Sequence, residues 1–128
     1  MAKPRVLIVE DNVDNFELVR FLLERAGYEV LSAANGVEGV VAAKREQPDL
    51  VLMDLSMPEM DGWKATAQMK AEETTRHIPV LALTAHTLPS ERKRAIDAGC
   101  DGYISKPINV ASFDKLVSTL VRHARAGL

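Results

Sequence analysis

Short apolar runs recur along the chain, and longer stretches with apolar residues three or four positions apart separate them. Runs such as Val6–Val9 and Leu50–Met53 lack the alternation of a half-exposed strand, which predicts strands covered on both faces. Parallel sheets flanked by helices bury their strands in this way. The predicted strands are Val6–Val9, Tyr28–Ala33, Leu50–Met53, Val80–Leu83 and Tyr103–Ile104.

The segments between the predicted strands have the spacing of amphipathic helices. In the first of them, Phe16, Val19 and Leu23 would lie on one face, and Gly27 is a typical helix stop. Four further helices are predicted at residues 37–43, 61–69, 90–98 and 113–121.

The order of elements, a strand followed by a helix five times, predicts the fold class. Connections between parallel strands are right-handed and place helices on both faces of the sheet. We therefore expect an α/β fold with a doubly wound, five-stranded parallel sheet and five helices, in one domain over residues 1–128. A chain of 128 residues has the size of a single domain and buries enough surface to fold without a disulfide or a structural metal.

Composition and charge exclude several classes of protein. The formal net charge of -2 argues against a dedicated nucleic-acid binder. Cys100 is the single cysteine, so an internal disulfide is excluded and an intracellular location is the simplest interpretation. The sequence has neither the apolar core of a signal peptide nor a membrane span, which needs about 20 apolar residues. We therefore expect a cytoplasmic protein that contacts neither nucleic acid nor membrane.

Polar and charged residues follow four of the predicted strands. Ligand sites of open parallel sheets lie at the carboxyl ends of the strands. Glu10 and Asp11 follow the first strand and Asp54 follows the third; Thr84 follows the fourth and Lys106 the fifth. Three carboxylates, a hydroxyl and an ammonium group are therefore predicted to converge at one edge of the sheet.

This set of groups indicates metal-assisted phosphoryl chemistry. Three clustered carboxylates repel one another, so at least one of their pKa values should rise without a compensating cation. Mg²⁺ suits the site because it prefers oxygen ligands, whereas zinc is disfavoured because no His or Cys has ligand spacing nearby. With a metal ion, a lysine and a hydroxyl, the site has the parts needed for phosphoryl transfer, in which an aspartate can be the nucleophile.

The residues at the strand ends lie in motifs that resemble the receiver domain of response regulators, the CheY-like family, over nearly the whole chain. One such motif is weak, but four in register at the ends of strands are highly specific. The resemblance implies the flavodoxin-like, CheY-like (βα)5 fold and a single-domain signalling module of a two-component or phosphorelay system. The motifs are Val6–Asn12, Asp54 with Met57–Gly62, Thr84-Ala85 and Tyr103–Pro107.

The resemblance implies a chemical role for each acidic residue. Asp54 would accept a phosphoryl group from the phosphohistidine of a histidine kinase or a histidine phosphotransfer protein. Asp11 and Asp54 would bind Mg²⁺ directly, Ser56 would add its backbone carbonyl, and Glu10 would act through water.

The resemblance also implies how phosphorylation is read out. Lys106 would pair with Asp54 and then with the phosphoryl oxygens, and the Lys106-Pro107 peptide bond would be cis. Thr84 would donate its hydroxyl to a phosphoryl oxygen, and Tyr103 would turn into the space that Thr84 leaves. A downstream protein would bind the face formed by the fourth helix, fifth strand and fifth helix. His86, two residues beyond Thr84, is a candidate for tuning the lifetime of the phosphorylated state.

Two other functions remain open on the residues alone. A Mg²⁺-dependent phosphohydrolase with an aspartate nucleophile is one, but the haloacid-dehalogenase-like pattern needs a carboxylate two residues after the nucleophile, where this chain has Ser56. An unphosphorylated binding scaffold is the other, although such receivers usually lack a pocket residue. We expect a signalling module rather than an enzyme. Structural roles are assigned to Asn12 as a helix cap, Trp63 as a packing residue and Cys100 as a half-buried thiol.

Overall fold

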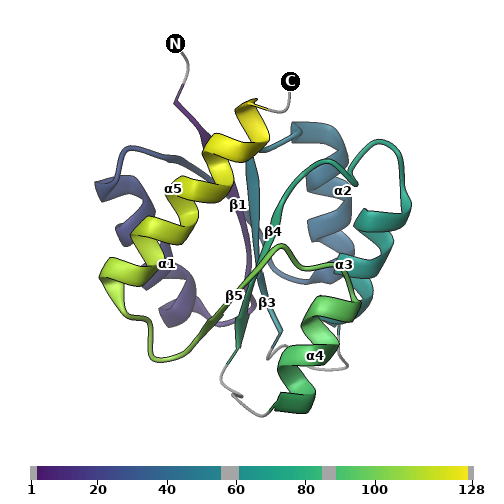
Figure 1. Cartoon of the computed structure of the whole chain (residues 1–128). Coiled ribbons are helices and arrows are strands. Elements are labelled where there is room, and N and C mark those ends of the chain that lie inside the picture. The colour runs from purple at the N-terminus through teal and green to yellow at the C-terminus, as the bar shows by residue number, and fades with distance from the viewer. Residues whose placement is uncertain (1–2, 56–60, 85–88, 127–128) are drawn as a thin grey trace.

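The computed structural model describes residues 3–55, 61–84 and 89–126, in which five strands and five helices alternate (Figure 1). Ser56 and His86 lie outside these described residues. The elements are β1 (Arg5–Val9), α1 (Val13–Arg25), β2 (Glu29–Ala33), α2 (Gly36–Glu46), β3 (Leu50–Asp54), α3 (Asp61–Ala71), β4 (Val80–Thr84), α4 (Pro89–Asp97), β5 (Gly102–Ser105) and α5 (Val110–Ala126).

The strands form one parallel sheet in the order β2-β1-β3-β4-β5, as the strand–helix alternation predicts. Asp54 pairs in register with Leu83, and Thr84 pairs with Ser105. Because all strands run the same way, their carboxyl ends meet at one edge of the sheet. This register places the residues that follow β1, β3, β4 and β5 beside one another.

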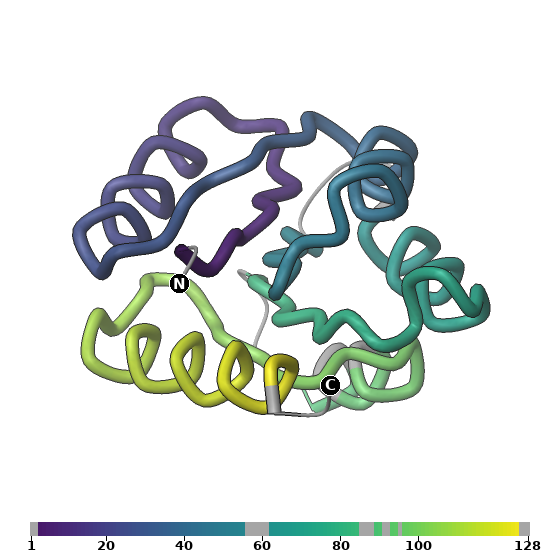
Figure 2. Tube along the Cα trace, turned by 90° about the horizontal axis from the view of Figure 1, so that it is seen from above, coloured from purple at the N-terminus to yellow at the C-terminus, as the bar shows by residue number. Residues whose placement is uncertain are grey.

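Helices cover both faces of the sheet, with α1 and α5 on one face and α2, α3 and α4 on the other (Figures 1 and 2). Successive residues of a strand point to opposite faces. In β1, Leu7 and Val9 therefore enter the core under α2 and α3, while Val6 and Ile8 enter the core under α1 and α5. All four are at most 1% exposed, which explains why the apolar runs do not alternate.

The helix ends follow the signals in the sequence. The Asn12 side chain caps α1 by accepting a hydrogen bond of 2.9 Å from Asn15 N, as predicted. Gly27 follows α1 with φ of +96°, a conformation that favours glycine. In α2 the spacing of apolar residues is a poorer guide to burial, because Val37 and Val41 are 73% and 53% exposed. None of the helices in the described part of the chain has the length and apolar character needed to cross a bilayer.

Candidate functional site

The structure brings together the charged residues at the carboxyl ends of β1, β3 and β5. One carboxylate oxygen each from Glu10, Asp11 and Asp54 lie within 4.8 Å of one another. Lys106 Nζ lies 3.3 Å from Asp54 Oδ2 and 3.7 Å from Glu10 Oε1. The second of these ion pairs, to Glu10, is not anticipated from the sequence. The result is a compact group of three acids and one base at the carboxyl edge of the sheet.

The four charged groups differ in their exposure to solvent. Asp54 is 2% exposed because it ends β3, which lies in the middle of the sheet between β1 and β4. Glu10 is 6% exposed, whereas Asp11 is exposed. The Lys106 side chain is 21% exposed, so its ammonium group reaches the carboxylates from the solvent side. The site therefore combines two buried carboxylates with an accessible rim.

Glu10 has a strongly raised pKa. The pKa rises from 4.5 to about 8; burial is the largest cause, and a hydrogen bond with the Asp54 carboxylate also raises it. The Asn12 N–H, 3.2 Å from Glu10 Oε2, and the Lys106 charge act in the opposite direction. The prediction that one carboxyl pKa rises is confirmed, but the largest cause is burial rather than repulsion between carboxylates.

The donor atoms of this cluster fit a hard divalent cation. Glu10 Oε1 is buried and has no hydrogen-bond partner among the described residues; the Lys106 ammonium lies 3.7 Å away. An unpartnered buried carboxylate oxygen is costly unless a cation or a proton compensates it. The cluster offers only carboxylate oxygens, which Mg²⁺ prefers and which suit zinc less well than nitrogen or sulfur.

Thr84 and Tyr103 flank this cluster on β4 and β5. Thr84 ends β4, is 2% exposed, and its carbonyl accepts a hydrogen bond of 2.7 Å from Lys106 N. Tyr103 is half-buried and packs against the core under α2 and α3. The Lys106-Pro107 peptide bond is cis.

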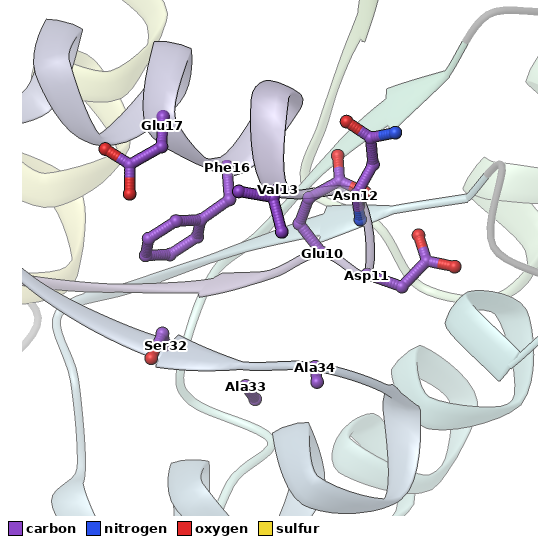
Figure 3. A pocket seen from close by; sticks show the side chains of 9 residues that line it. All are labelled: Glu10, Asp11, Asn12, Val13, Phe16, Glu17, Ser32, Ala33 and Ala34. Atoms are coloured by element: carbon purple, nitrogen blue, oxygen red, sulfur yellow. Dashed lines mark hydrogen bonds between the residues drawn. The ribbon is translucent and has the colours of Figure 1, made fainter.

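A groove of about 330 Å³ opens beside the acidic cluster (Figure 3). It extends from the end of β1 along the start of α1 and the end of β2. Asp54, Thr84 and Lys106 do not line it, so the groove adjoins the cluster and is not the phosphoryl site expected from the sequence. Its lining residues are Glu10, Asp11, Asn12, Val13, Phe16, Glu17, Ser32, Ala33 and Ala34.

Two contacts around α3 are not anticipated from the sequence. A Cβ at Gly62 would lie 2.7 Å from the Asp54 carbonyl oxygen, so the start of α3 approaches the backbone of Asp54 closely. The guanidinium carbon of Arg94 lies 4.9 Å from the centre of the Trp63 ring. The Asp61-Gly62 pair indicates only a helix start, and no local pattern connects Trp63 with Arg94.

Comparison with known proteins identifies relatives over nearly the whole chain. The family model described as "Response regulator receiver domain" matches residues 6–118. The polar-differentiation response regulators DivK of Brucella anthropi and Brucella ovis are each 41% identical over 119 residues, which is 93% of this chain and 97% of either relative.

Solved structures resemble this chain to a similar extent. The receiver domain of the sensor histidine kinase PA1611 from Pseudomonas aeruginosa PAO1, which has a magnesium ion in its active site cleft, aligns with a TM-score of 0.86 and 34% identity over 94% of this chain and 98% of that one. Chemotaxis protein CheY4 of Vibrio cholerae aligns with a TM-score of 0.85 and 29% identity, covering 93% and 99%. The chain therefore belongs to the response regulator receiver domain family, the phosphorylation-dependent signalling modules of two-component systems.

Proposed function

We propose that Asp54 is the residue on which this receiver domain is phosphorylated. The observation that carries the proposal is the ion pair of 3.3 Å between Asp54 Oδ2 and Lys106 Nζ, at the sheet edge where Glu10 and Asp11 also lie. A phosphorylated carboxylate needs positive charge nearby to stabilise the phosphoryl oxygens, and Lys106 supplies it. Asp11 is the exposed member of the cluster, whereas Asp54 has both the lysine and the central position.

The donor of the phosphoryl group is proposed to be a phosphohistidine on a histidine kinase or a phosphotransfer protein. A carboxylate oxygen of Asp54 attacks phosphorus and forms the P–O bond, while the P–N bond to the histidine breaks and its electron pair returns to the imidazole. Water later attacks the phosphorus of the acyl phosphate, which breaks the P–O bond to Asp54, releases inorganic phosphate and restores the carboxylate. Such a module works with an ATP-dependent kinase, which favours the cytoplasm as its location.

We further propose that Glu10, Asp11 and Asp54 hold Mg²⁺, Glu10 through water, with the Ser56 carbonyl as a further ligand. Glu10 Oε1 supports this assignment, because it is buried and accepts no hydrogen bond among the described residues, with only the longer ion pair of 3.7 Å to Lys106 Nζ. A bound Mg²⁺ would offset the negative charge of the carboxylates and of the incoming phosphoryl group. Lys106 would remain next to the phosphoryl oxygens after transfer.

Phosphorylation is proposed to act by shifting a conformational equilibrium. The phosphoryl group adds roughly -1.5 to -2 charge and three strong acceptors, to which Thr84 would donate its hydroxyl and Lys106 its ammonium protons. Tyr103 would turn toward the space left by Thr84, and the face of α4, β5 and α5 would change for a downstream protein. Near-complete switching needs about 5 kcal/mol, which two or three charge-assisted hydrogen bonds of roughly 1.5–3 kcal/mol each can supply. His86 remains a candidate for setting the lifetime of this state.

The proposal is tested by incubating the protein with Mg²⁺ and acetyl phosphate and measuring its intact mass. We expect one added phosphoryl group, lost when EDTA replaces Mg²⁺ and absent in Asp54→Asn. Asp14→Asn is the matched control because Asp14 is an exposed aspartate in the first turn of α1. Unchanged phosphorylation of Asp54→Asn would overturn the assignment, and many turnovers of a phosphomonoester per protein would favour a phosphohydrolase.

A further inference from the structure

Trp63 connects α3 with α4 through a contact between its ring and the Arg94 side chain. Trp63 lies in the first turn of α3, is 9% exposed and packs into the core under α2 and α3. The guanidinium carbon of Arg94, on α4, is 4.9 Å from the ring centre, within the range of about 6 Å in which a cation is attracted to an aromatic face. The contact joins two helices on the same side of the sheet (Figure 1).

The α3 end of this contact is adjacent to the proposed phosphoacceptor. Gly62 precedes Trp63, and a Cβ at Gly62 would lie 2.7 Å from the Asp54 carbonyl oxygen and 3.0 Å from Leu55 Cδ2. The backbone at the start of α3 therefore packs directly on the end of β3. A change in the position of the Asp54 backbone acts on α3 one residue away from Trp63.

The α4 end of the contact, Arg94, lies on the exposed surface. Every α4 side chain that the structure describes is exposed, including Ile96 at 62%. The contact of Arg94 with Trp63 therefore joins an exposed side chain of α4 to a buried side chain of α3. Thr84, at the end of β4, is five residues before the start of α4, which gives α4 a second connection to the site.

We propose that the Trp63–Arg94 contact holds α4 in its unphosphorylated position and opposes the switch to the signalling state. This inference rests on the proposed function of Asp54, because it concerns the regulation of that site. A contact made in one state only shifts the equilibrium by its own strength. By linkage, deleting the contact tightens the binding of a phosphoryl mimic by the same factor, roughly two- to five-fold for an exposed cation–π pair.

The test is a calorimetric titration with beryllofluoride in the presence of Mg²⁺, which mimics the phosphoryl group on an aspartate. We expect Arg94→Gln and Trp63→Leu each to lower the Kd roughly two- to five-fold, and the double variant to lower it no further because both delete one contact. Trp63→Phe, which keeps a weaker aromatic face, is expected to fall between wild type and Trp63→Leu. Arg20→Gln is the matched control because Arg20 is an exposed arginine on α1 that pairs with Glu17 and Glu24.

Tryptophan fluorescence supplies a second readout, since Trp63 is the chain's only tryptophan. We expect beryllofluoride to change the Trp63 emission of the wild type and to change that of Arg94→Gln less, because the contact is already absent. If Trp63→Leu does not fold, Arg94→Gln and Trp63→Phe carry the test, because Arg94 is exposed and the phenyl ring keeps the core filled.

The possible results separate the inference from the function on which it rests. Equal Kd values for wild type and Arg94→Gln, or additive effects of the two substitutions, would overturn the coupling while leaving Asp54 as the acceptor. No binding of beryllofluoride to the wild type would overturn the proposed function and the coupling together.

Discussion

Lys106 Nζ lies 3.3 Å from Asp54 Oδ2, and this ion pair spans the sheet edge from the end of β3 to the residue after β5. The same ammonium group lies 3.7 Å from Glu10 Oε1. One partly buried cation is thus shared by two buried carboxylates, while the exposed Asp11 adds further negative charge. In the absence of a metal ion, Lys106 is the main compensation for the acidic cluster among the described residues.

Replacing Lys106 by methionine tests this compensation. We expect the metal-free variant to lose about 1–3 kcal/mol of unfolding free energy at neutral pH, because the buried Asp54 carboxylate loses its cation. The variant should bind Mg²⁺ more tightly than the wild type, since a competing positive charge is gone. Urea unfolding in EDTA and calorimetric Mg²⁺ titration measure the two effects. Weaker Mg²⁺ binding by Lys106→Met would contradict the account.

The pH dependence of stability tests the raised pKa of Glu10. The pKa is about 8 in the folded protein against 4.5 as the ordinary value, so the folded state binds the extra proton between these pH values. Glu10 therefore stabilises the fold fully below pH 4.5, and this contribution is lost as the pH rises through 8, by up to about 1.4 kcal/mol per pH unit. Urea unfolding in EDTA at several pH values should show a flatter profile for Glu10→Gln. Equal slopes for both proteins would contradict the burial of Glu10.

A second partly buried lysine, Lys70, supports the opposite edge of the sheet. Lys70 Nζ lies 2.8 Å from Asp101 Oδ2 and donates a hydrogen bond of 2.8 Å to Ile78 O. Asp101 Oδ2 also accepts a hydrogen bond of 2.8 Å from Val80 N, so the pair connects α3 with the starts of β4 and β5.

Because the side chain of Lys70 is only 20% exposed, we expect Lys70→Met to cost about 1–3 kcal/mol of unfolding free energy. Lys44→Met is the matched control: its ion pair with Glu72 is more exposed and should be worth less than about 1 kcal/mol. Urea unfolding measures both losses. Acetyl phosphate should still phosphorylate folded Lys70→Met, because the acceptor lies at the other edge; equal losses for the two variants would contradict the structural role of Lys70.

Cys100 is expected to be chemically inert in the folded protein. Burial raises the pKa of its thiol from 9.0 to about 11, against a lowering hydrogen bond with Thr66. At pH 8 this pKa leaves about a hundredth of the thiolate of an ordinary cysteine. A thiolate of higher pKa is more nucleophilic, which offsets part of this loss, so disulfide exchange should be roughly tenfold slower than in urea. Ellman's reagent measures both rates, and similar rates would show that Cys100 is accessible.

The strands and the convergence of the charged residues at one sheet edge were predictable because they depend on local patterns. A continuous apolar run such as Val6–Val9 indicates a strand buried on both faces, and parallel strands bring their following residues to one edge. The burial of Glu10 was not predictable in this way. Glu10 and Asp11 are neighbours of the same type, and only the direction of each side chain decides which one is buried.

Contacts between residues far apart in the sequence could not be predicted from local patterns either. Trp63 and Arg94 are far apart in the sequence, and their meeting depends on how α3 and α4 pack on the sheet. Val37 and Val41 show that local spacing can also predict burial for residues that are exposed. Their spacing is that of a buried helix face, but α2 packs on β1 through small residues such as Gly39, whose Cβ position would be 2.8 Å from Val9 Cγ2.

The most direct test of the central claim is to trap the phosphorylated residue chemically. Borohydride reduces an aspartyl phosphate to homoserine, which marks the modified position permanently in a peptide. After treatment with Mg²⁺ and acetyl phosphate, reduction and digestion, mass spectrometry should find homoserine at position 54 and unmodified aspartate at position 11. Homoserine at position 11, or at no aspartate when phosphate is incorporated, would contradict the assignment of Asp54 as the acceptor.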